Sequence, residues 1–468
     1  MLTLSAMTEV AMSRVPNLGL ADAMRRADCS NKRLAERVRL VAQEEGVILR
    51  CTHVDVKRWL DGVQPRSSTA GFIAEALSRK AAVRFSLEDI GMAGVVTPAT
   101  LERGLEYSDD VPDAVSRLLG ITRRDLADDP LALEASIVPT AWVQPLLTWL
   151  LSRAEPLPVR AGAQASVGES DVAAIRTTTQ LFMKLDFQYG GGHARASLAQ
   201  YYVREVGPLL EGKFTEPVGR MLFSAAAEVA QLLGWTAYDI GRHGLAQRYL
   251  IQALRLAQAA DDRMMGGRIL GNMSHQANYL GNFSQAVQLA RAAQEGSKGV
   301  ASATTMASFL AMEARAHAGS GHDPSCSRAL REAEKLFEGR NIFDDPEWIS
   351  YFDDAELAGE GAHCFRDLRN ARVAQEFVGR CLELTDPVYV RTLAFIRFVE
   401  AATYIHQGEP GQAVALAKQA IELAGSLKSG RYLRYVSDLC AELEPFRTDS
   451  EVTAFRELVS RKYPSLKV

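Results

Sequence analysis

The stretch Gly241–Ala253, GRHGLAQRYLIQA, starts with a glycine that is followed five and twelve residues later by alanines, Ala246 and Ala253. The same arrangement recurs around four further anchor positions, Gly281, Gly321, Arg369 and Gly408. Successive anchors are separated by steps of 40, 40, 48 and 39 residues. A regular step of this size predicts a repeat protein in which each copy is one supersecondary unit.

Small residues mark three positions in every copy. Seven residues before the anchors stand Gly234, Ser274, Ala314, Ala362 and Ala401. The residues five and twelve positions after Gly281, Gly321, Arg369 and Gly408 are, in that order, Ala286 and Ala293, Cys326 and Ala333, Ala374 and Cys381, and Ala413 and Ala420. Two antiparallel helices that pack closely around a turn need such residues, so the pattern resembles the tetratricopeptide repeat, although its period is longer than the usual ~34 residues. Five units predict an α-solenoid of ten helices with a concave face. We also expect degenerate units within residues 171–233 and a cap over residues 451–468.

In this fold the first helix of each unit lines the concave face, at six, three and two residues before the anchor. The middle three units then place six polar side chains in one groove: His275, Asn278, Tyr279, Arg315, His363 and Arg366. Such side chains can bind an extended peptide through its backbone and its carboxylates. The alternative is a hydrated groove that binds nothing or contacts the protein's own linker.

A different pattern precedes the repeats. Short amphipathic segments are predicted to begin near Asn17, Ser30, Thr52 and Ser68 or Thr69, with a fifth from Ser86. The third segment lies in THVDVKRWLDGVQPR (Thr52–Arg66), where Asp55 completes a capping box. Val56, Trp59 and Leu60 are predicted to face inward. The outward residues of this helix are predicted to be His53, Val54, Lys57 and Arg58.

The run VKRWLDGVQPR (Val56–Arg66) resembles the lambda-repressor-like (Cro-type) helix-turn-helix family, whose pattern is V-x-R-W-x-x-G-x-x-P-R. Ile73–Leu77 and Leu87–Gly91 fit the fourth and fifth helices of that family. The resemblance implies that the third helix enters the major groove of double-stranded DNA. The implied DNA-binding residues are Thr52, His53, Val54, Lys57, Arg58 and Arg66. The segment Gly46–Cys51 is longer than the family's turn. The alternative for the basic residues is a solvated helix face.

The charge distribution favours contact between the N-terminal part and a polyanion. The net charge is −4, but residues 1–92 hold 14 Lys and Arg against 11 Asp and Glu, which leaves 39 against 46 for the remainder. Within residues 30–85 the count is 11 against 6. A basic block on an acidic body indicates that one end of the chain meets a polyanion.

Composition and motifs restrict the other functions. The sequence contains no run of about 18 apolar residues, so no membrane span is predicted. Residues 1–13 lack the features of a secretory signal. The six cysteines are scattered without a CxxC pair, as expected for small apolar residues in a reducing cytoplasm. No HExxH, GxSxG or metal-ligand cluster is present, so we expect no enzymatic activity, catalytic residue, metal or cofactor. The glycines of FQYGGGHAR (Phe187–Arg195) are predicted to form a helix–helix turn rather than an anion-binding nest.

The combination of the two patterns resembles actinobacterial transcriptional regulators with a Cro-type head and a tetratricopeptide body, over Pro16–Gly91 and Asp171–Ala424. The resemblance implies a cytoplasmic, homodimeric, sequence-specific DNA-binding regulator whose solenoid senses a peptide or small-molecule effector or a partner protein. The alternative is a protein-interaction scaffold with a degenerate helix-turn-helix that does not bind DNA. We therefore expect an all-α protein with a frayed N-terminus (1–15), a five-helix helix-turn-helix domain (16–92), a helical connector and flexible linker (93–170) and a solenoid for effector binding and dimerisation (171–468).

Overall fold

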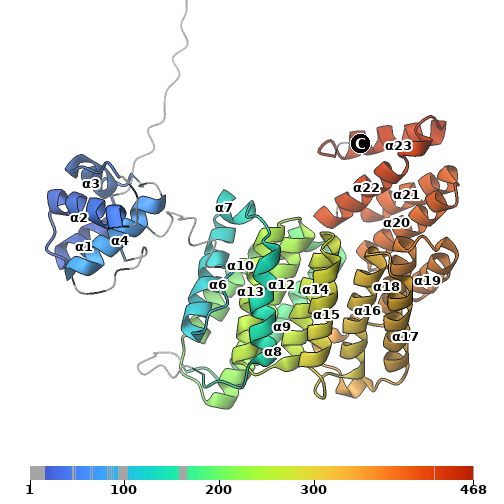
Figure 1. The fold of residues 1–468 in the computed structure, drawn as a ribbon, viewed down its shortest axis with the longest axis horizontal. Coiled ribbons are helices and arrows are strands. Elements are labelled where there is room, and N and C mark those ends of the chain that lie inside the picture. Colours follow the sequence, from blue (N-terminus) through green and yellow to red (C-terminus); the bar gives the residue numbers. More distant parts are fainter. Residues whose placement is uncertain are drawn as a thin grey trace, which may run out of the picture. The chain divides into compact units, whose positions relative to one another are not determined.

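The computed structural model describes residues 16–44, 47, 49–63, 65, 67–81, 83, 85, 87, 89–92, 104–157, 166–425 and 427–466. In this part of the chain the regular elements are helices, and one isolated β-bridge joins Ser166 to Lys213. Two compact units are formed by Met1–Arg103 and Gly104–Val468 (Figure 1). The predicted frayed segment 1–15 and residues 158–165 of the predicted linker lie outside the described residues.

The first unit contains four described helices: α1 (Leu18–Arg26), α2 (Asn31–Glu44), α3 (His53–Leu60) and α4 (Ser67–Ala81). The predicted cap on α1 is confirmed, because Asn17 Oδ1 accepts a hydrogen bond of 2.9 Å from the Leu20 amide. Apolar residues at helical spacing in these helices form one core: Leu20, Met24, Ala27, Leu34, Val38, Val41, Val56, Trp59, Ile73, Ala76 and Leu77. Of the three residues of α3 predicted to face inward, Val56 and Trp59 are buried, whereas Leu60 is partly buried and packs against this core. Amphipathic periodicity therefore located this core correctly.

The fifth helix of this unit was expected to begin at Ser86. Residues 86 and 88 lie outside the described part of the chain, and the described residues 87 and 89–91 lie in turns. Ile90 is nevertheless fully buried, and the carbonyl of Ile90 accepts a hydrogen bond of 3.1 Å from Asn17 Nδ2. The described residues of this segment therefore pack against the start of α1 in turns, and the predicted fifth helix is not seen among them.

The second unit contains the helix pairs that the repeat predicts. They are α12 (Glu216–Asp239) with α13 (His243–Ala259), α14 (Arg263–Tyr279) with α15 (Phe283–Gly296), α16 (Ala303–Gly319) with α17 (Asp323–Glu338), α18 (Asp354–Asp367) with α19 (Ala371–Leu384), and α20 (Val390–His406) with α21 (Pro410–Ala424). Every anchor lies in the left-handed region, with φ of 85° at Gly241, 78° at Gly281, 77° at Gly321, 57° at Arg369 and 80° at Gly408. This conformation favours glycine, which explains the residue type at four of the five anchors.

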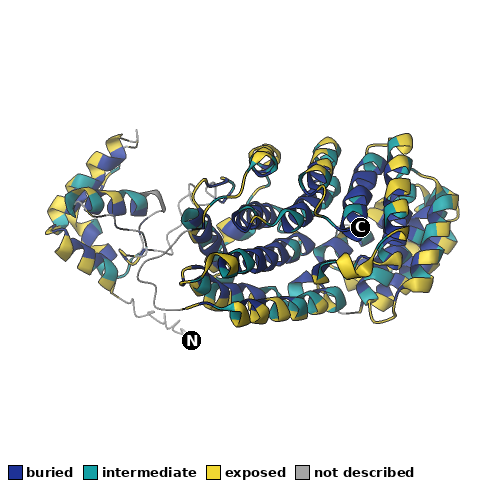
Figure 2. Cartoon of the chain, turned by 90° about the horizontal axis from the view of Figure 1, so that it is seen from below, coloured by how far each residue is buried: buried dark blue, intermediate teal, exposed yellow. Residues whose placement is uncertain are grey.

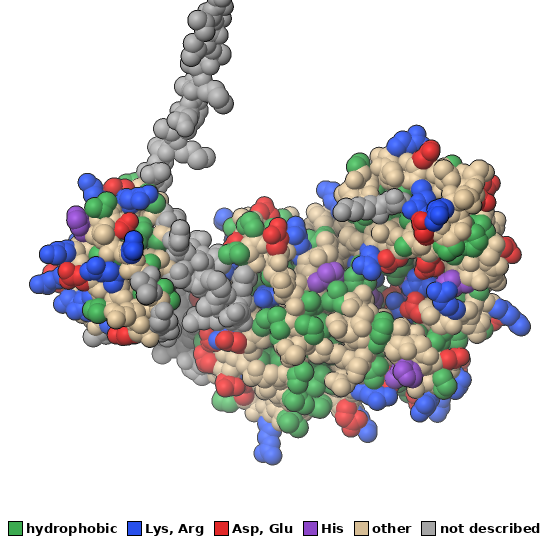
Figure 3. Space-filling model, turned by 45° about the horizontal axis from the view of Figure 1, so that its top comes forward, with side chains coloured by type: hydrophobic (Ala, Val, Ile, Leu, Met, Phe, Trp, Pro, Cys, Tyr) green, Lys and Arg blue, Asp and Glu red, His purple; other side chains and the backbone are tan. Residues whose placement is uncertain are grey.

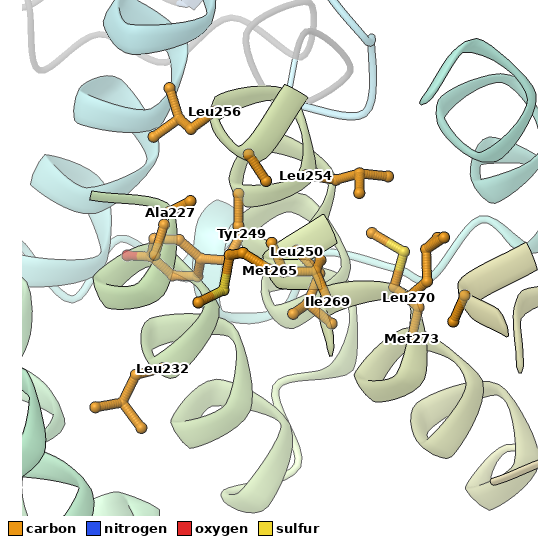
Figure 4. Packing of buried hydrophobic residues seen from close by; sticks show 14 of the residues in the cluster. Ala227, Leu232, Tyr249, Leu250, Leu254, Leu256, Met265, Ile269, Leu270 and Met273 are labelled. Atoms are coloured by element: carbon orange, nitrogen blue, oxygen red, sulfur yellow. The ribbon is translucent and has the colours of Figure 1, made fainter. Parts of the chain in front are cut away.

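The small residues of the repeat allow the two helices of each pair to approach closely. All of those predicted at the three repeat positions are buried. A Cβ on Gly234 would lie 2.9 Å from Leu250 Cγ, so α12 and α13 leave no room for a side chain there. Figure 4 shows Leu250, Met265 and Ile269 meeting in the core between these helices and α14. In Figure 2 buried residues fill the inside of the helical stack, and exposed residues lie along its outer helices.

The segment expected to be a connector is part of the second unit. It forms α6 (Val111–Leu126), α7 (Pro130–Leu133), η1 (Pro139–Trp142) and α8 (Val143–Leu151), and these elements pack against α10, α13 and α15. Trp149 is 1% exposed and fits where Gly266 and Gly296 leave space, because a Cβ on either glycine would overlap its indole ring. Buried aromatic residues thus fix 104–157 to the repeats, a contact that no local pattern in this segment indicates.

The remaining elements lie before the helix pairs, after them and, for two short 3-10 helices (η3 and η4), between α17 and α18. They are α9 (Glu169–Tyr189), α10 (Gly191–Tyr201), η2 (Tyr202–Val206), α11 (Gly207–Leu210), η3 (Ile342–Asp344), η4 (Glu347–Ile349), α22 (Gly430–Glu442), η5 (Glu444–Phe446) and α23 (Ser450–Lys462). Gly190, with φ of 84°, forms the predicted turn between α9 and α10. The predicted C-terminal cap corresponds to α23, which packs on α21 through Val452, Phe455 and Val459.

Contacts between α9 and the last repeats join the two ends of the inner face. The Lys428 amide donates to the Tyr189 carbonyl at 3.0 Å, and the Gly192 amide donates to the Lys428 carbonyl at 3.0 Å. Arg391 Nη1 lies 3.0 Å from Asp186 Oδ2. These contacts join the first and last helices around the inner face, whereas the sequence led us to expect a concave groove without such a closure.

Candidate functional site

Helix α3 in the first unit is fixed at both ends by hydrogen bonds, one set within the helix start and one to a residue distant in the sequence. The Thr52 amide and hydroxyl both donate to Asp55 Oδ2, at 2.9 and 2.8 Å, which forms the predicted capping box. These hydrogen bonds lower the pKa of Asp55 and keep it charged at the helix N-terminus. At the other end the Asn17 amide donates to the Leu60 carbonyl at 2.9 Å. The helix therefore presents a fixed outer face.

The outer face of α3 carries the predicted side chains. His53, Val54, Lys57 and Arg58 are exposed, while Val56 and Trp59 are buried, as predicted. Among the described residues, no carboxylate lies within 4.0 Å of the Lys57 or Arg58 charge. Lys and Arg side chains also gather on the face of this unit seen in Figure 3. Thr52 is exposed at the helix N-terminus, and Arg66 lies outside the described residues.

A second candidate site is a chamber among the stacked helix pairs of the second unit. Its wall is formed by the first helices of the repeats, α12, α14, α16, α18 and α20, together with α9, α22 and residues 349–352. The cavity measures about 140 Å³. Its apolar wall consists largely of aromatic rings, those of Phe187, Trp235, Phe309, Tyr351, Phe352 and Phe395. The chamber is therefore an internal site that all the repeats build together.

Buried charges pair with one another around the chamber. Three ion pairs join Arg315 Nη1 to Glu360 Oε2 at 2.6 Å, Arg391 Nη1 to Asp186 Oδ2 at 3.0 Å and Arg268 Nη1 to Glu228 Oε1 at 3.7 Å. Every side chain in these pairs is less than a tenth exposed. Burial raises the pKa of Asp186, and the adjacent Arg391 guanidinium opposes the rise. Removing one partner of such a pair is strongly destabilising, so these pairs fix the relative positions of the helices.

Arg431 is a further buried cation of the wall. Its guanidinium lies over three rings, with the carbon atom Cζ 5.3, 5.1 and 5.2 Å from the ring centres of Trp235, Tyr238 and Phe395. Its Nη1 is 3.9 Å from Asp239 Oδ1, which also accepts a hydrogen bond from the Ser429 hydroxyl at 3.0 Å. The aromatic rings stabilise the charge by cation–π attraction and leave the edge of the guanidinium available for an anion.

Two histidines of the chamber are held neutral. His275 Nδ1 lies 2.9 Å from the Tyr238 hydroxyl, and His363 Nδ1 lies 3.4 Å from the Tyr435 hydroxyl. Burial lowers the pKa of both imidazoles well below the ordinary value, and Arg315 and Arg431 lower both further. Both rings therefore act as neutral hydrogen-bonding groups at neutral pH.

The six predicted groove residues fall into two adjoining sites. His275, Arg315 and His363 line the chamber. Asn278, Tyr279, Arg315 and Arg366 line a more open pocket of about 300 Å³ between α14, α16, α18, α20 and α22. Arg315 is thus common to both sites. The predicted residues do lie on the inner helices, but they line two pockets rather than the single groove that we expected.

Several chamber residues were missed by the sequence reasoning. One set lies thirteen residues before the repeat anchors, which is two helical turns before the position at −6 that was used for the prediction. These residues are Glu228, Arg268, Ser308, Glu356 and Phe395. Four of these line the chamber, and Glu228 pairs with Arg268. Extending the concave-face pattern by seven residues would have found them. Asp186 and Arg431 lie outside the five copies, so no repeat position could have indicated them.

The model of the SP15 N-terminal domain family matches residues 20–93, which contain α1 from its third residue and all of α2, α3 and α4. No curated protein matches the chain. Within the described residues, no helix is both long and apolar enough to cross a membrane, and no three His, Cys, Asp or Glu side chains are grouped as metal ligands. All six cysteines are buried and form no disulfide.

Proposed function

We propose that the protein is a sequence-specific DNA-binding transcriptional regulator whose second unit binds an effector that controls DNA binding. The observation that carries the DNA-binding part is the outer face of α3. Its cations, Lys57 and Arg58, are exposed and form no ion pair with any described residue. Its inner residues Val56 and Trp59 hold the helix on the core of the first unit. A helix with exposed cations on one face suits binding to a DNA duplex.

The dimensions and side chains of α3 fit major-groove recognition. Eight residues at ~1.5 Å each give a rod of roughly 12 Å, similar to the ~12 Å width of the groove. Lys57 and Arg58 can donate to guanine N7 and O6, and Val54, with 52% of its surface exposed, can contact a thymine methyl group. His53 and Thr52 lie at the helix N-terminus, where they can meet phosphate oxygens.

The resemblance of Val56–Arg66 to the Cro-type helix-turn-helix pattern supports the same assignment. We propose that two copies bind together, because a dimer places two such helices ~34 Å apart on a nearly palindromic site. Occupation of the second unit would then shift the dimer between DNA-competent and DNA-incompetent arrangements.

Selection of bound duplexes from a random DNA library tests the proposal. The full-length protein is expected to enrich one sequence family. The double variant Lys57→Ala, Arg58→Ala is then expected to lose about 1–3 kcal/mol of binding free energy for each base contact removed. The matched control is Arg328→Ala, Arg331→Ala on α17, which removes two exposed cations from the second unit. Fluorescence anisotropy of the selected duplex measures both affinities.

Salt dependence separates this function from that of a scaffold whose first unit does not bind DNA. A DNA-binding protein releases counterions from the phosphates, so the logarithm of its affinity falls roughly linearly with the logarithm of the salt concentration. Equal affinities of the wild type and the α3 double variant for the selected duplex, together with a flat salt dependence, would contradict the proposal and favour the scaffold.

A further inference from the structure

Five buried side chains in the chamber wall each keep a polar atom without a hydrogen-bond partner in the described structure. The atoms are Arg315 Nε, Arg431 Nε, Asp186 Oδ1, Gln231 Oε1 and Arg268 Nη1, whose ion pair with Glu228 at 3.7 Å is too long for a hydrogen bond. Each of these residues is at most 8% exposed. A buried polar group without a partner costs about 1–3 kcal/mol, and more when it is charged. Five such atoms around one cavity indicate that the cavity holds something that completes their hydrogen bonds.

The unpartnered atoms specify the polarity of the occupant. Three are arginine nitrogens, which can only donate, and they project from α14, α16 and α22. The other two are oxygens that can accept, and they come from α9 and α12. One small molecule satisfies both kinds only if it carries an anionic acceptor, for which arginine is well suited, and also a hydrogen-bond donor.

The size and walls of the chamber specify the rest of the occupant. The cavity of about 140 Å³ is similar to engineered cavities of ~150 Å³ that accept a benzene ring. Trp235, Phe309 and Phe395 supply ring faces and edges against which a flat apolar body can pack. An extended peptide needs a long groove, whereas this cavity of about 140 Å³ has room for a compact molecule only.

We infer that the chamber binds a compact single-ring compound that carries a carboxylate and a hydrogen-bond donor, in the manner of a hydroxybenzoate or an aromatic amino acid. The carboxylate accepts hydrogen bonds from the arginines, the ring packs between the aromatic walls, and the donor reaches Asp186 or Gln231. This inference deepens the sensing role proposed above and rests on it for the regulatory consequence. The binding of the compound is inferred from the cavity and its unpartnered atoms alone and does not depend on the sensing role.

Three probes test the inference on the full-length protein without DNA: 4-hydroxybenzoate, L-phenylalanine and L-tyrosine. At least one is expected to raise Tm by about 2 °C or more at about 1 mM and to give a saturable calorimetric isotherm. Benzoate lacks the donor of 4-hydroxybenzoate, and phenol lacks its carboxylate. Each is expected to bind about tenfold more weakly than 4-hydroxybenzoate if that is the probe that binds, because each leaves some of the buried groups unpaired.

Gly271 offers a variant that fills the chamber without changing its charges. A Cβ at this position would lie 3.5 Å from the nearest atom of Phe309, so Gly271→Ala fits in ordinary contact. Gly271→Leu projects further into the chamber. We expect Gly271→Leu to abolish the Tm response to the probe, while Gly271→Ala, the matched control, retains it.

Gln231→Leu separates a binding role from a structural one. Removing a buried amide whose oxygen lacks a partner is expected to raise Tm of the protein alone and to weaken probe binding at least about threefold. A purely structural glutamine would not produce these opposite changes.

Two results would overturn the inference: no response to any of the three probes, which would leave a water-filled chamber, or an undiminished response in Gly271→Leu. Both measurements are made without DNA. Failure of the α3 variants to affect DNA binding would therefore contradict the proposed function and leave the chamber result standing.

Discussion

Arg369 is the one anchor of the five repeats that is not glycine, and its φ of 57° places it in the left-handed region. A residue with a Cβ pays for this conformation, whereas glycine adopts it freely. We expect Arg369→Gly to raise the free energy of unfolding by about 1 kcal/mol. Gly321→Ala makes the opposite change at another anchor. Its φ of 77° is also left-handed, and an added Cβ there would meet no atom within 4 Å, so only the backbone preference is tested.

Thermal melting of the two variants measures the effect. Gly321→Ala is expected to lower Tm, by about as much as Arg369→Gly raises it. The reason is that the added Cβ makes the left-handed backbone conformation less favourable and meets no other atom. A destabilised Arg369→Gly variant would show that the exposed arginine makes a stabilising contact that outweighs its backbone cost.

Glu356 is a titratable residue of the chamber whose charge depends on pH near neutrality. Burial, with contributions from Glu360 and Asp353, raises its pKa from 4.5 to about 8, although Arg391 and Arg431 oppose the rise. The folded protein therefore keeps a proton on Glu356 after the unfolded chain has released it. This contribution to stability is complete below about pH 4.5 and is lost as the pH rises to about 8.

Glu356→Gln stays neutral at every pH and should remove this dependence. We expect Tm of the wild type to fall relative to that of Glu356→Gln as the pH is raised from 5 to 9. Glu332→Gln, an exposed position on α17, is the control and should follow the wild type. Parallel pH profiles for the wild type and Glu356→Gln would contradict the protonated state of Glu356.

At the scale of single elements, the helices with strong periodicity were predictable from the sequence. The buried face of α3 and its capping box follow from spacing alone, because they depend only on contacts within a few residues. The repeat anchors were predictable for the same reason, since each left-handed turn is a local requirement. The helices α6 and α8 were assigned to a connector because their sequence does not show that Trp149 enters a space left by Gly266 and Gly296.

The composition of the chamber was predictable only in part. His275, Arg315 and His363 followed from the helical register. Asp186 and Arg391 are 205 residues apart, and their contact depends on how far the solenoid winds before α9 meets α20. Small rotations between successive repeats accumulate into that winding. The sequence contains no local signal for their sum, so an open groove was the natural expectation.

At the scale of the whole molecule, the proposed function assigns DNA binding to the first unit and ligand binding to the second. The first offers a rigid cationic helix, and the second encloses a chamber whose wall includes helices from every repeat. An occupant of that chamber would contact several repeats at once and could bias their relative arrangement. Such a ligand alters DNA binding only if its affinity differs between the two arrangements of the dimer.

The central claim is that α3 lies in the major groove of a specific DNA site. Dimethyl sulfate protection tests it most directly, because the reagent methylates guanine N7 in the major groove and adenine N3 in the minor groove. On the selected duplex we predict protection of guanine N7 in each half-site, and loss of that protection when Lys57 and Arg58 are replaced by alanine. Protection confined to adenine N3, or guanine protection that persists in the double variant, would contradict the claim.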